Sequence, residues 1–300
     1  MTVERDVVLV DAPSNLGLRP PAPGCVPGCS KAPGALRDAG LLDRLAAREG
    51  GVVVPPRYEP AWTPETGVRN GAAIVDYAVR LARRIDGVRR AGGFPLLLGG
   101  ECSNVIGAAM NLHATGRYGL AYVDGHSDFR NPGNSAEAGI AAGGEALALV
   151  TGRGADELGV PRGLVRDADV VQLGIHDLDE DVDELRAVGI TVVTSDDIRT
   201  LGIDHAVGAA AGVLDRPELD GFWIHVDVDV VDGELLPAVD SPDPGGITFD
   251  QLGALLQGLL SIEGAVGMNV GIYDPDLDPD LVHAGVIVET LVAAFGIAAA

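Results

Sequence analysis

The chain has 300 residues, and its 44 acidic side chains against 21 Lys and Arg give a formal net charge of −23 at pH 7. Such a surface repels phosphate backbones and anionic lipid, so the composition argues against nucleic-acid and membrane-surface binding. An apolar fraction of 47% excludes a disordered chain, and no run of about 18 apolar residues predicts a transmembrane helix. Three cysteines, and an N-terminus without a basic stretch leading into an apolar one, predict a cytoplasmic protein rather than a secreted disulfide scaffold.

Short apolar runs alternate with amphipathic stretches along the chain. The runs predict strands at Val7–Val10, Val52–Val54, Phe94–Leu98, Gly119–Val123, Val170–Gly174, Thr191–Thr194, Phe222–Val226 and Val266–Tyr273. The stretches predict helices at Ala35–Arg48, Gly71–Arg90, Ser103–His113, His205–Leu214, Phe249–Leu260 and Leu281–Phe295. Apolar runs without polar alternation are typical of strands buried on both faces, and intervening helices favour a parallel sheet. The sequence therefore predicts one α/β domain over residues 1–300, with three α-β-α layers and a mostly parallel sheet of about eight strands.

Polar clusters follow three of these strands. They are Gly99–Ser103, Asp124–Asp128 and Asp227–Asp229, with Asp232 shortly after. Because ligands of an open parallel sheet bind beyond the carboxyl ends of its strands, the clusters are expected at one edge. Residues two apart in extended backbone point the same way, so Asp124, His126 and Asp128 are expected to converge. The same spacing is expected to bring Asp227 and Asp229 together.

Four carboxylates and an imidazole at one point would repel and raise one another's pKa values unless cations lie among them. The set exceeds what one ion takes from protein, so two divalent ions bridged by carboxylates are expected, about 3.5–4 Å apart. Oxygen and imidazole donors favour manganese, whereas the soft sulfur of Cys102 favours zinc, iron or nickel. Either motif alone has a plainer interpretation, as a solvated loop or a helix cap. Together, each after a buried strand, they indicate a metal site.

The other cysteines and histidines give weaker signals. Cys25 and Cys29 have no second Cys or His pair with them, so a structural zinc site is not favoured there. His225 lies two residues before Asp227, and it either lies behind the metal ligands or packs inside the sheet. The histidines without a partner pattern are His113, His176, His205 and His283.

Motifs over nearly the whole chain resemble those of the ureohydrolase family, which includes arginase, agmatinase and formimidoylglutamase. Leu98–Ser103 resembles the family's Gly-Gly-Asp-His-Ser, and Asp124–Asp128 resembles its Asp-Ala-His-x-Asp. Further matches are Val226–Asp232 with Pro237–Val239 and Pro244–Gly246, which resemble the long Asp-x-Asp signature, and Pro33–Leu41 and Gly174–Asp179.

The resemblance implies an arginase-like fold and a binuclear manganese site. The ligands that it implies are Cys102 on one ion, His126 on the other, Asp124 and Asp227 as bridges, and Asp128 and Asp229 on one ion each. A hydroxide shared by the ions, hydrogen-bonded to Asp128, would attack an sp² carbon and release an amine. The family commonly forms trimers or hexamers, so a homo-oligomer that acts on a small-molecule substrate is expected.

Four departures from the family's pattern fall at the site. Cys102 stands where the family has a histidine ligand, and its thiolate would weaken that ion as a Lewis acid. Ile272 stands in place of the glutamate that holds the guanidinium group, and isoleucine cannot form that pair. Glu145, beside the match to a proton-shuttling His-Gly pair, either replaces the shuttle or is a surface acid, which is favoured. Arg130 replaces an asparagine, and either clamps a substrate carboxylate or lies in solvent.

These departures predict a metal-dependent hydrolase whose substrate is a linear amidine, a modified guanidine or an amide, and not plain arginine or agmatine. The candidate catalytic residues are Asp128 and Glu145, and the candidate substrate contacts are Arg130, Asp179 and Ile272. The alternative is a catalytically silent member that binds metal or regulates a partner. The lost histidine and glutamate favour this alternative, and the intact carboxylate cluster opposes it. A phosphohydrolase is disfavoured, because the chain has neither a P-loop nor a basic cluster.

Overall fold

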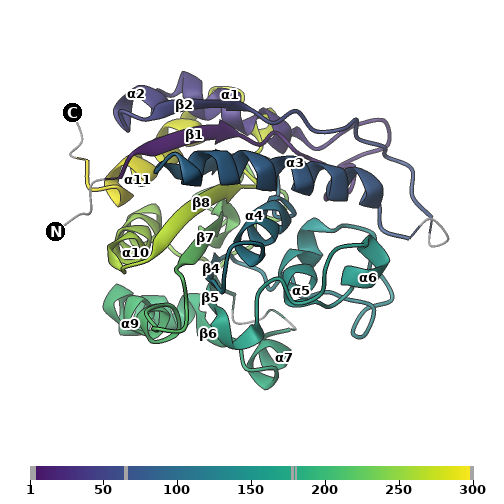
Figure 1. The fold of residues 1–300 in the computed structure, drawn as a ribbon. Coiled ribbons are helices and arrows are strands. Elements are labelled where there is room, and N and C mark those ends of the chain that lie inside the picture. Colours follow the sequence, from purple (N-terminus) through teal and green to yellow (C-terminus); the bar gives the residue numbers. More distant parts are fainter. Residues whose placement is uncertain (1–4, 64–66, 177–178, 180, 298–300) are drawn as a thin grey trace.

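A computed structural model describes residues 5–63, 67–176, 179 and 181–297. Within this part of the chain, eight strands form one sheet in the order β2-β1-β3-β8-β7-β4-β5-β6 (Figure 1). All neighbours run parallel. The strands are β1 Val7–Asp11, β2 Arg48–Val52, β3 Phe94–Leu98, β4 Gly119–Val123, β5 Val170–Ile175, β6 Thr191–Thr194, β7 Phe222–Asp227 and β8 Ala265–Gly271. The predicted parallel α/β sheet is thereby confirmed.

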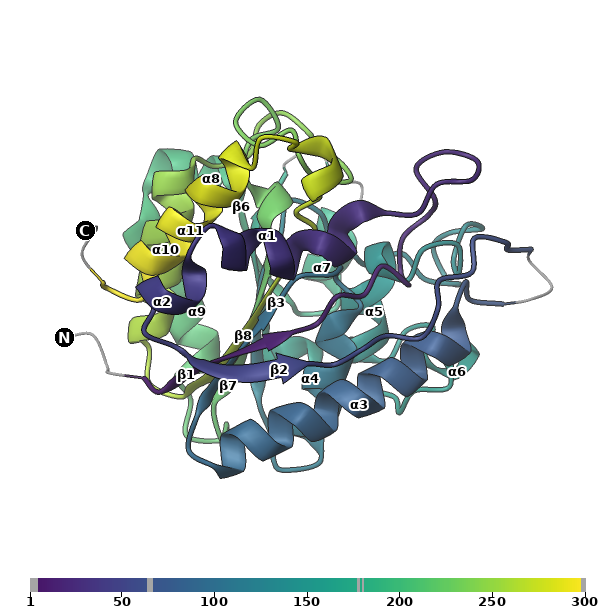
Figure 2. The ribbon, with the colours of Figure 1, turned by 90° about the horizontal axis from the view of Figure 1, so that it is seen from above.

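Helices cover both faces of the sheet, with α3 and α4 on one side and α9, α10 and α11 on the other (Figures 1 and 2). Every residue of β3, β4 and β7 is buried, which explains why their sequences read as uninterrupted apolar runs. The helices are α1 Ala32–Asp38, α2 Leu41–Arg44, α3 Gly71–Arg90, α4 Asn104–His113, α5 Ala146–Thr151, α6 Ala155–Leu158, α7 Val182–Ala187, α8 Ser195–Leu201, α9 Ile203–Leu214, α10 Phe249–Ser261 and α11 Val282–Ala294. None of the helices in the described ranges is long and apolar enough to cross a bilayer.

Two sequence predictions in the first third of the chain are wrong. The single helix expected at 35–48 is divided into α1 and α2 by Gly40, whose φ of +88° ends helical geometry. The strand expected at 52–54 lies earlier, at Arg48–Val52. Its Glu-Gly-Gly centre has low strand propensity, so pairing with the neighbouring β1 decides its position.

The sheet order brings the polar strand ends together. β3, β8, β7 and β4 are consecutive neighbours, although they are far apart in the sequence. The turn after β3 passes close to another loop, because a Cβ on Gly100 would lie 2.5 Å from the Ala12 carbonyl oxygen. Gly100 also has a φ of +83°, which a side chain would strain. The turn at Gly100 leads to Cys102, whose Sγ lies 2.9 Å from Asp227 Oδ2 at the end of β7.

Candidate metal centre

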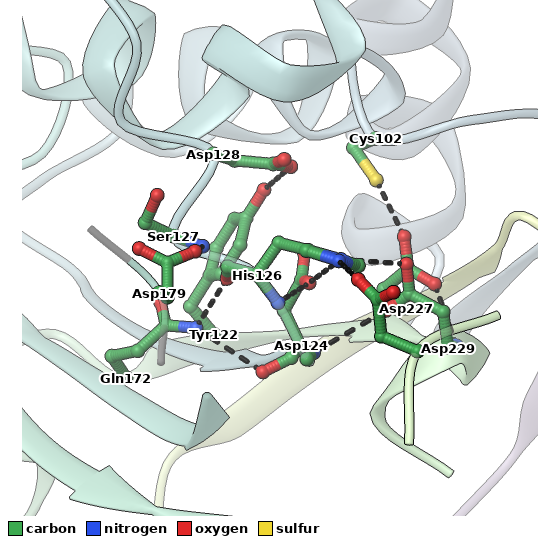
Figure 3. A network of polar contacts seen from close by, with 12 residues as sticks. Cys102, Tyr122, Asp124, His126, Ser127, Asp128, Gln172, Asp179, Asp227 and Asp229 are labelled. Atoms are coloured by element: carbon green, nitrogen blue, oxygen red, sulfur yellow. Dashed lines mark hydrogen bonds and ion pairs between the residues drawn. The ribbon is translucent and has the colours of Figure 1, made fainter. Parts of the chain in front are cut away.

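Four aspartates from two neighbouring strands gather at the carboxyl edge of the sheet (Figure 3). Asp124 and Asp128 follow β4, while Asp227 ends β7 and Asp229 follows it. Their exposed fractions are 1%, 7%, 2% and 5%. Buried carboxylates need compensating charge or hydrogen-bond donors, so the packing of four of them defines a strongly anionic centre.

The aspartates converge by turns of the backbone and not, as the sequence spacing suggested, along an extended chain. Asp227 accepts a hydrogen bond from the Asp229 amide at 2.8 Å and so begins a 3₁₀ turn at Val228–Val230. Asp128 has a left-handed φ of +46°. The expected convergence is therefore present, but its extended-backbone explanation is wrong.

His126 is the basic side chain inside the cluster. Its Nδ1 lies 3.0 Å from Asp229 Oδ2, and its Nε2 lies 3.0 Å from Asp243 Oδ2. The negative charge of Asp229 is the main reason that the pKa of His126 rises to about 11. The sequence did not single out Asp243, which approaches from a loop more than a hundred residues away. His176, also not singled out, packs edge-on against the His126 ring at 5.5 Å.

Cys102 packs at the edge of the hydrophobic core and turns its sulfur toward the carboxylates. Its Sγ lies 2.9 Å from Asp227 Oδ2, and the side chain is 2% exposed. Burial, reinforced by the charges of neighbouring aspartates, raises the pKa of the thiol well above its usual range. The thiol therefore stays protonated among the protein groups alone, and it would need a cation beside it to ionise.

Burial and mutual repulsion shift the pKa values of the four aspartates. Burial, followed by mutual repulsion, raises the pKa of Asp124 and of Asp227 well above the usual range. Burial also raises the pKa of Asp128 to about 7. Burial alone would raise the pKa of Asp229, but the facing His126 imidazolium outweighs it and lowers that pKa. His126 thus pairs with Asp229 in the cluster and with Asp243 outside it. Within the described residues, the other three aspartates of the cluster have no positively charged side chain as close as 3.0 Å.

Two aromatic rings form the floor under the cluster. Tyr122 and His225 are paired in register across β4 and β7, and their rings stack at 4.2 Å. The Tyr122 hydroxyl donates to Asp128 Oδ2 at 2.5 Å (Figure 3). Complete burial lowers the pKa of His225 to about 4, so this imidazole is neutral. Sequence reasoning missed Tyr122, although its position two residues before Asp124 on a strand was a usable signal.

A cavity of about 510 Å³ opens above the aspartates. Of the expected substrate contacts, Arg130, Asp179 and Ile272 all lie on its wall. Sequence reasoning did not find three other charged residues on this wall, namely Arg19, Asp181 and Asp240. The cavity wall thus has both basic and acidic side chains, and the aspartates of the cluster lie at its base.

Ile272 occupies this wall in an unusual backbone conformation. It directly follows β8, is 4% exposed and has a φ of +74°. Positive φ is rare for a β-branched residue and costs of the order of 1–3 kcal/mol. The surrounding structure holds it there, since the Ile272 amide donates to the Gly100 carbonyl oxygen at 2.8 Å. An apolar side chain is therefore fixed at this point of the cavity wall.

Glu145 is not the surface acid that the sequence favoured. It is 2% exposed, and its Oε1 accepts a hydrogen bond from the Gly139 amide at 2.6 Å. The cavity wall includes the preceding Gly143 and Gly144 but not Glu145 itself. Burial raises the pKa of Glu145 to about 7. The observed contact ties together the loop between β4 and α5, and a proton-shuttle role stays a prediction.

The raised pKa of Glu145 predicts a pH-dependent stability. Between pH 4.5 and about 7 the folded carboxyl keeps a proton that the unfolded one has lost, so its contribution to stability falls as pH rises. We expect Glu145→Gln, which keeps the acceptor oxygen, to raise the free energy of unfolding by about 1–3 kcal/mol at pH 8 and by nothing below pH 4.5. Urea unfolding at both pH values measures this, with exposed Glu137→Gln as the control. An equal effect at both pH values would contradict the titration of Glu145.

Three other residues that the sequence analysis named, Asp232, Cys25 and Cys29, lie outside the cluster. Asp232 turns away from the aspartates and accepts from the Glu234 and Gly245 amides at 2.9 and 2.8 Å, so it shapes a loop. Cys29 is buried and donates toward the Ser14 carbonyl oxygen, while Cys25 is exposed. No candidate metal cluster within the described residues contains either cysteine.

Comparison with known proteins identifies the family. The Arginase family model matches residues 5–296, and the chain therefore belongs to the arginase family. An arginase of Staphylococcus aureus strain MRSA252 is 27% identical over 289 residues, which cover 93% of each chain. At this low identity, the chain is a divergent member of the arginase family.

Solved structures support the same fold. The arginase of Bacillus caldovelox superposes with a TM-score of 0.85 at 24% identity, covering 98% of this chain and 99% of that one. The formimidoylglutamase of Bacillus subtilis gives a TM-score of 0.75 at 18% identity, covering 97% and 85%. The two enzymes named here act on different substrates, so the fold leaves the substrate of this chain open.

Proposed function

We propose that this protein is a binuclear metal-dependent hydrolase of C–N bonds in a linear amidine, a modified guanidine or an amide. The observation that carries the proposal is the convergence of four buried carboxylates, one imidazole and one thiol below a single cavity. Family membership supports the same class of reaction. A homo-oligomeric, cytoplasmic protein formed by one domain stays the expectation.

The donor set fits divalent cations. Asp124 Oδ2 is buried without a hydrogen-bond partner in the described part of the chain, and it faces the other donors. Cys102 would hold one ion and His126 the other, Asp124 and Asp227 would bridge, and Asp128 and Asp229 would each hold one. Manganese suits the oxygen ligands best, and the sulfur leaves zinc, iron or nickel open. When bound, the ions would activate water and stabilise negative charge on the attacked group.

Asp128 is the group best placed to hold a proton of the attacking water. The Tyr122 hydroxyl occupies Asp128 Oδ2, which fixes the plane of the carboxylate and leaves Oδ1 for the cavity side. The left-handed backbone at Asp128 turns this side chain toward the cavity, whose wall it shares. Asp128 thus orients the water, and Tyr122 orients Asp128.

The cavity wall favours a substrate with charge at one end and a neutral or weakly basic reacting group at the other. Arg130 suits a carboxylate, and Asp179 suits an amine. Asp179 is itself held by the Ser127 amide at 3.0 Å, which connects it to the metal motif. Ile272 presents no charge to a guanidinium. This wall argues against plain arginine, in spite of the names of the relatives.

Metal analysis tests the centre directly. We expect the purified protein to bind two equivalents of Mn²⁺, and Co²⁺ loading to produce a thiolate charge-transfer band that Cys102→Ser abolishes. Cys102→His should lose the band but keep both ions, because an imidazole replaces the sulfur. Absence of bound ion in the wild-type protein would contradict the proposed centre.

Ammonia and amine release then tests the reaction. The loaded protein is assayed with formimidoyl amino acids, N-substituted arginines and ω-amides, beside arginine and agmatine. Hydrolysis of a member of the first group, with kcat of about 1 s⁻¹ or more, is the expected result. Two bound ions with no turnover of any of them would favour the silent, metal-binding alternative.

A further inference from the structure

The hydrogen bonds around His225 show which of its ring nitrogens carries the proton. It is completely buried in β7, two residues before Asp227. Its Nε2 lies 3.8 Å from Asp124 Oδ2, and both atoms are buried without a hydrogen-bond partner among the described residues. The imidazole also falls within a group of possible metal donors with Cys102 and Asp128. It could therefore be either a ligand or a hydrogen-bond donor to a ligand, depending on which ring nitrogen carries the proton.

Trp223 fixes the orientation of the neighbouring amide. Its indole Nε1 lies 2.8 Å from Asn269 Oδ1 on the adjacent strand β8. An indole N–H only donates, so the atom that faces it must be the amide oxygen. The indole cannot shift far, because it packs against Gly267, where a Cβ would lie 2.0 Å from the ring. The Asn269 amide therefore turns its NH₂ group away from Trp223.

That NH₂ group fixes the tautomer of His225. Asn269 Nδ2 lies 2.7 Å from His225 Nδ1. Because Nδ2 donates, Nδ1 must accept with its lone pair, and the proton of the neutral ring is on Nε2. A flipped Asn269 would set two donors against each other at Trp223, and a proton on Nδ1 would do the same at His225. The Nε2–H consequently points toward Asp124 Oδ2 and has no lone pair to offer a metal.

We propose that His225 is a positioning residue and not a metal ligand: Trp223 and Asn269 hold it as the Nε2–H tautomer, whose N–H faces Asp124 Oδ2 across 3.8 Å and acts on that carboxylate through its fixed dipole. Of the two stacked rings, Tyr122 donates a hydrogen bond to Asp128, and His225 turns its N–H toward a second carboxylate, that of Asp124. The relay Trp223–Asn269–His225–Asp124 orients one metal-binding carboxylate from inside the sheet. This inference rests on the proposed metal centre, because Asp124 needs an orientation only if it holds ions.

Nitrogen NMR of the full-length protein, labelled with ¹⁵N-histidine, measures the tautomer. We expect a protonated Nε2 and an unprotonated Nδ1 for His225, both after EDTA treatment and after loading with diamagnetic Zn²⁺. The signal is assigned by its loss in His225→Gln. Trp223→Phe should release the amide and give a mixture of tautomers. A proton on Nδ1 in the wild-type protein, or loss of the Nε2 proton on adding Zn²⁺, would overturn the proposal.

Zn²⁺ titration separates positioning from ligation and from a packing role. His225→Leu removes the donor and should weaken Zn²⁺ binding about 10–100-fold. His225→Gln can still present an N–H to Asp124 and should stay within about three-fold of the wild type, which is well below the loss expected for the leucine variant. Equal losses in both variants would mean ligation, and unchanged affinity in both would mean packing only. If the leucine variant does not fold, the Zn²⁺ affinity of the glutamine variant and the NMR tautomer pattern distinguish positioning from ligation. A wild-type protein that binds no Zn²⁺ contradicts the metal centre itself, which is a different failure.

Discussion

Asp227→Asn is expected to lose at least one of two bound metal ions, since it removes a carboxylate that would bridge them. Asparagine keeps the Oδ1 that accepts from the Asp229 amide at 2.8 Å, so the 3₁₀ turn should survive. The change therefore tests charge and coordination with little disturbance of the backbone. Metal content after dialysis, measured by plasma emission spectrometry, gives the stoichiometry.

The same variant should change thermal stability in opposite directions with and without metal. In EDTA it should melt at a higher temperature than the wild type, because one buried charge that raises the pKa values of its neighbours is gone. With metal at 100 times Kd, the wild type gains about 2.7 kcal/mol per site and the variant should lose most of that gain for the affected site.

Asp232→Asn serves as the matched control for Asp227→Asn. Asp232 belongs to the same segment, but its side chain caps loop amides and does not face the cluster. It should leave metal content unchanged. Full metal occupancy in Asp227→Asn, or an equal loss in the Asp232 control, would contradict the assignment of Asp227 as a bridging ligand.

Ile272→Glu is expected to create activity toward a free guanidinium group. The residue lies on the cavity wall, and a carboxylate there could form a charge-assisted pair of about 1.5–3 kcal/mol with the substrate. Urea release from arginine or agmatine should then rise in kcat/KM by about 10–100-fold. Glutamate is not β-branched, so it should tolerate the φ of +74° at least as well as isoleucine does.

Ile272→Gln separates charge from shape in this experiment. It has nearly the same size as the glutamate variant but no charge, and it should leave arginine turnover at the wild-type level. Equal gains in the two variants would mean that cavity shape, not charge, limits the wild type. Wild-type urea release from arginine with kcat near 10 s⁻¹, an ordinary enzymatic value, would overturn the proposed substrate class.

The sequence predicted the sheet and the main acidic donors because local patterns carry that information. Uninterrupted apolar runs specify strands buried on both faces, and Phe94–Leu98 and Gly119–Val123 lie where the runs predicted them. Thr191–Thr194 also lies where it was predicted, although this edge strand is only partly buried. The same reasoning failed for β2, whose Gly-rich edge strand is positioned by its neighbour and not by its own residues.

The sequence did not predict the burial and the contacts of several single side chains. Glu145 looked like a surface acid because glutamate is mostly exposed, but the loop between β4 and α5 folds over it. Asp243 gave no signal, because its contact with His126 joins two loops that only the fold brings together. The role of His225 depends on an asparagine 44 positions further on.

By itself, then, the sequence determined a parallel α/β sheet and the polar clusters at its strand ends, since burial and strand periodicity act locally. It also identified the family through motifs that the family comparison bears out. Only the tertiary structure decided how these ends meet, because β3, β8, β7 and β4 become neighbours through long crossovers. It likewise decided the His225 tautomer and the strained Ile272 wall, because hydrogen-bond direction and backbone strain are set by contacts between distant segments.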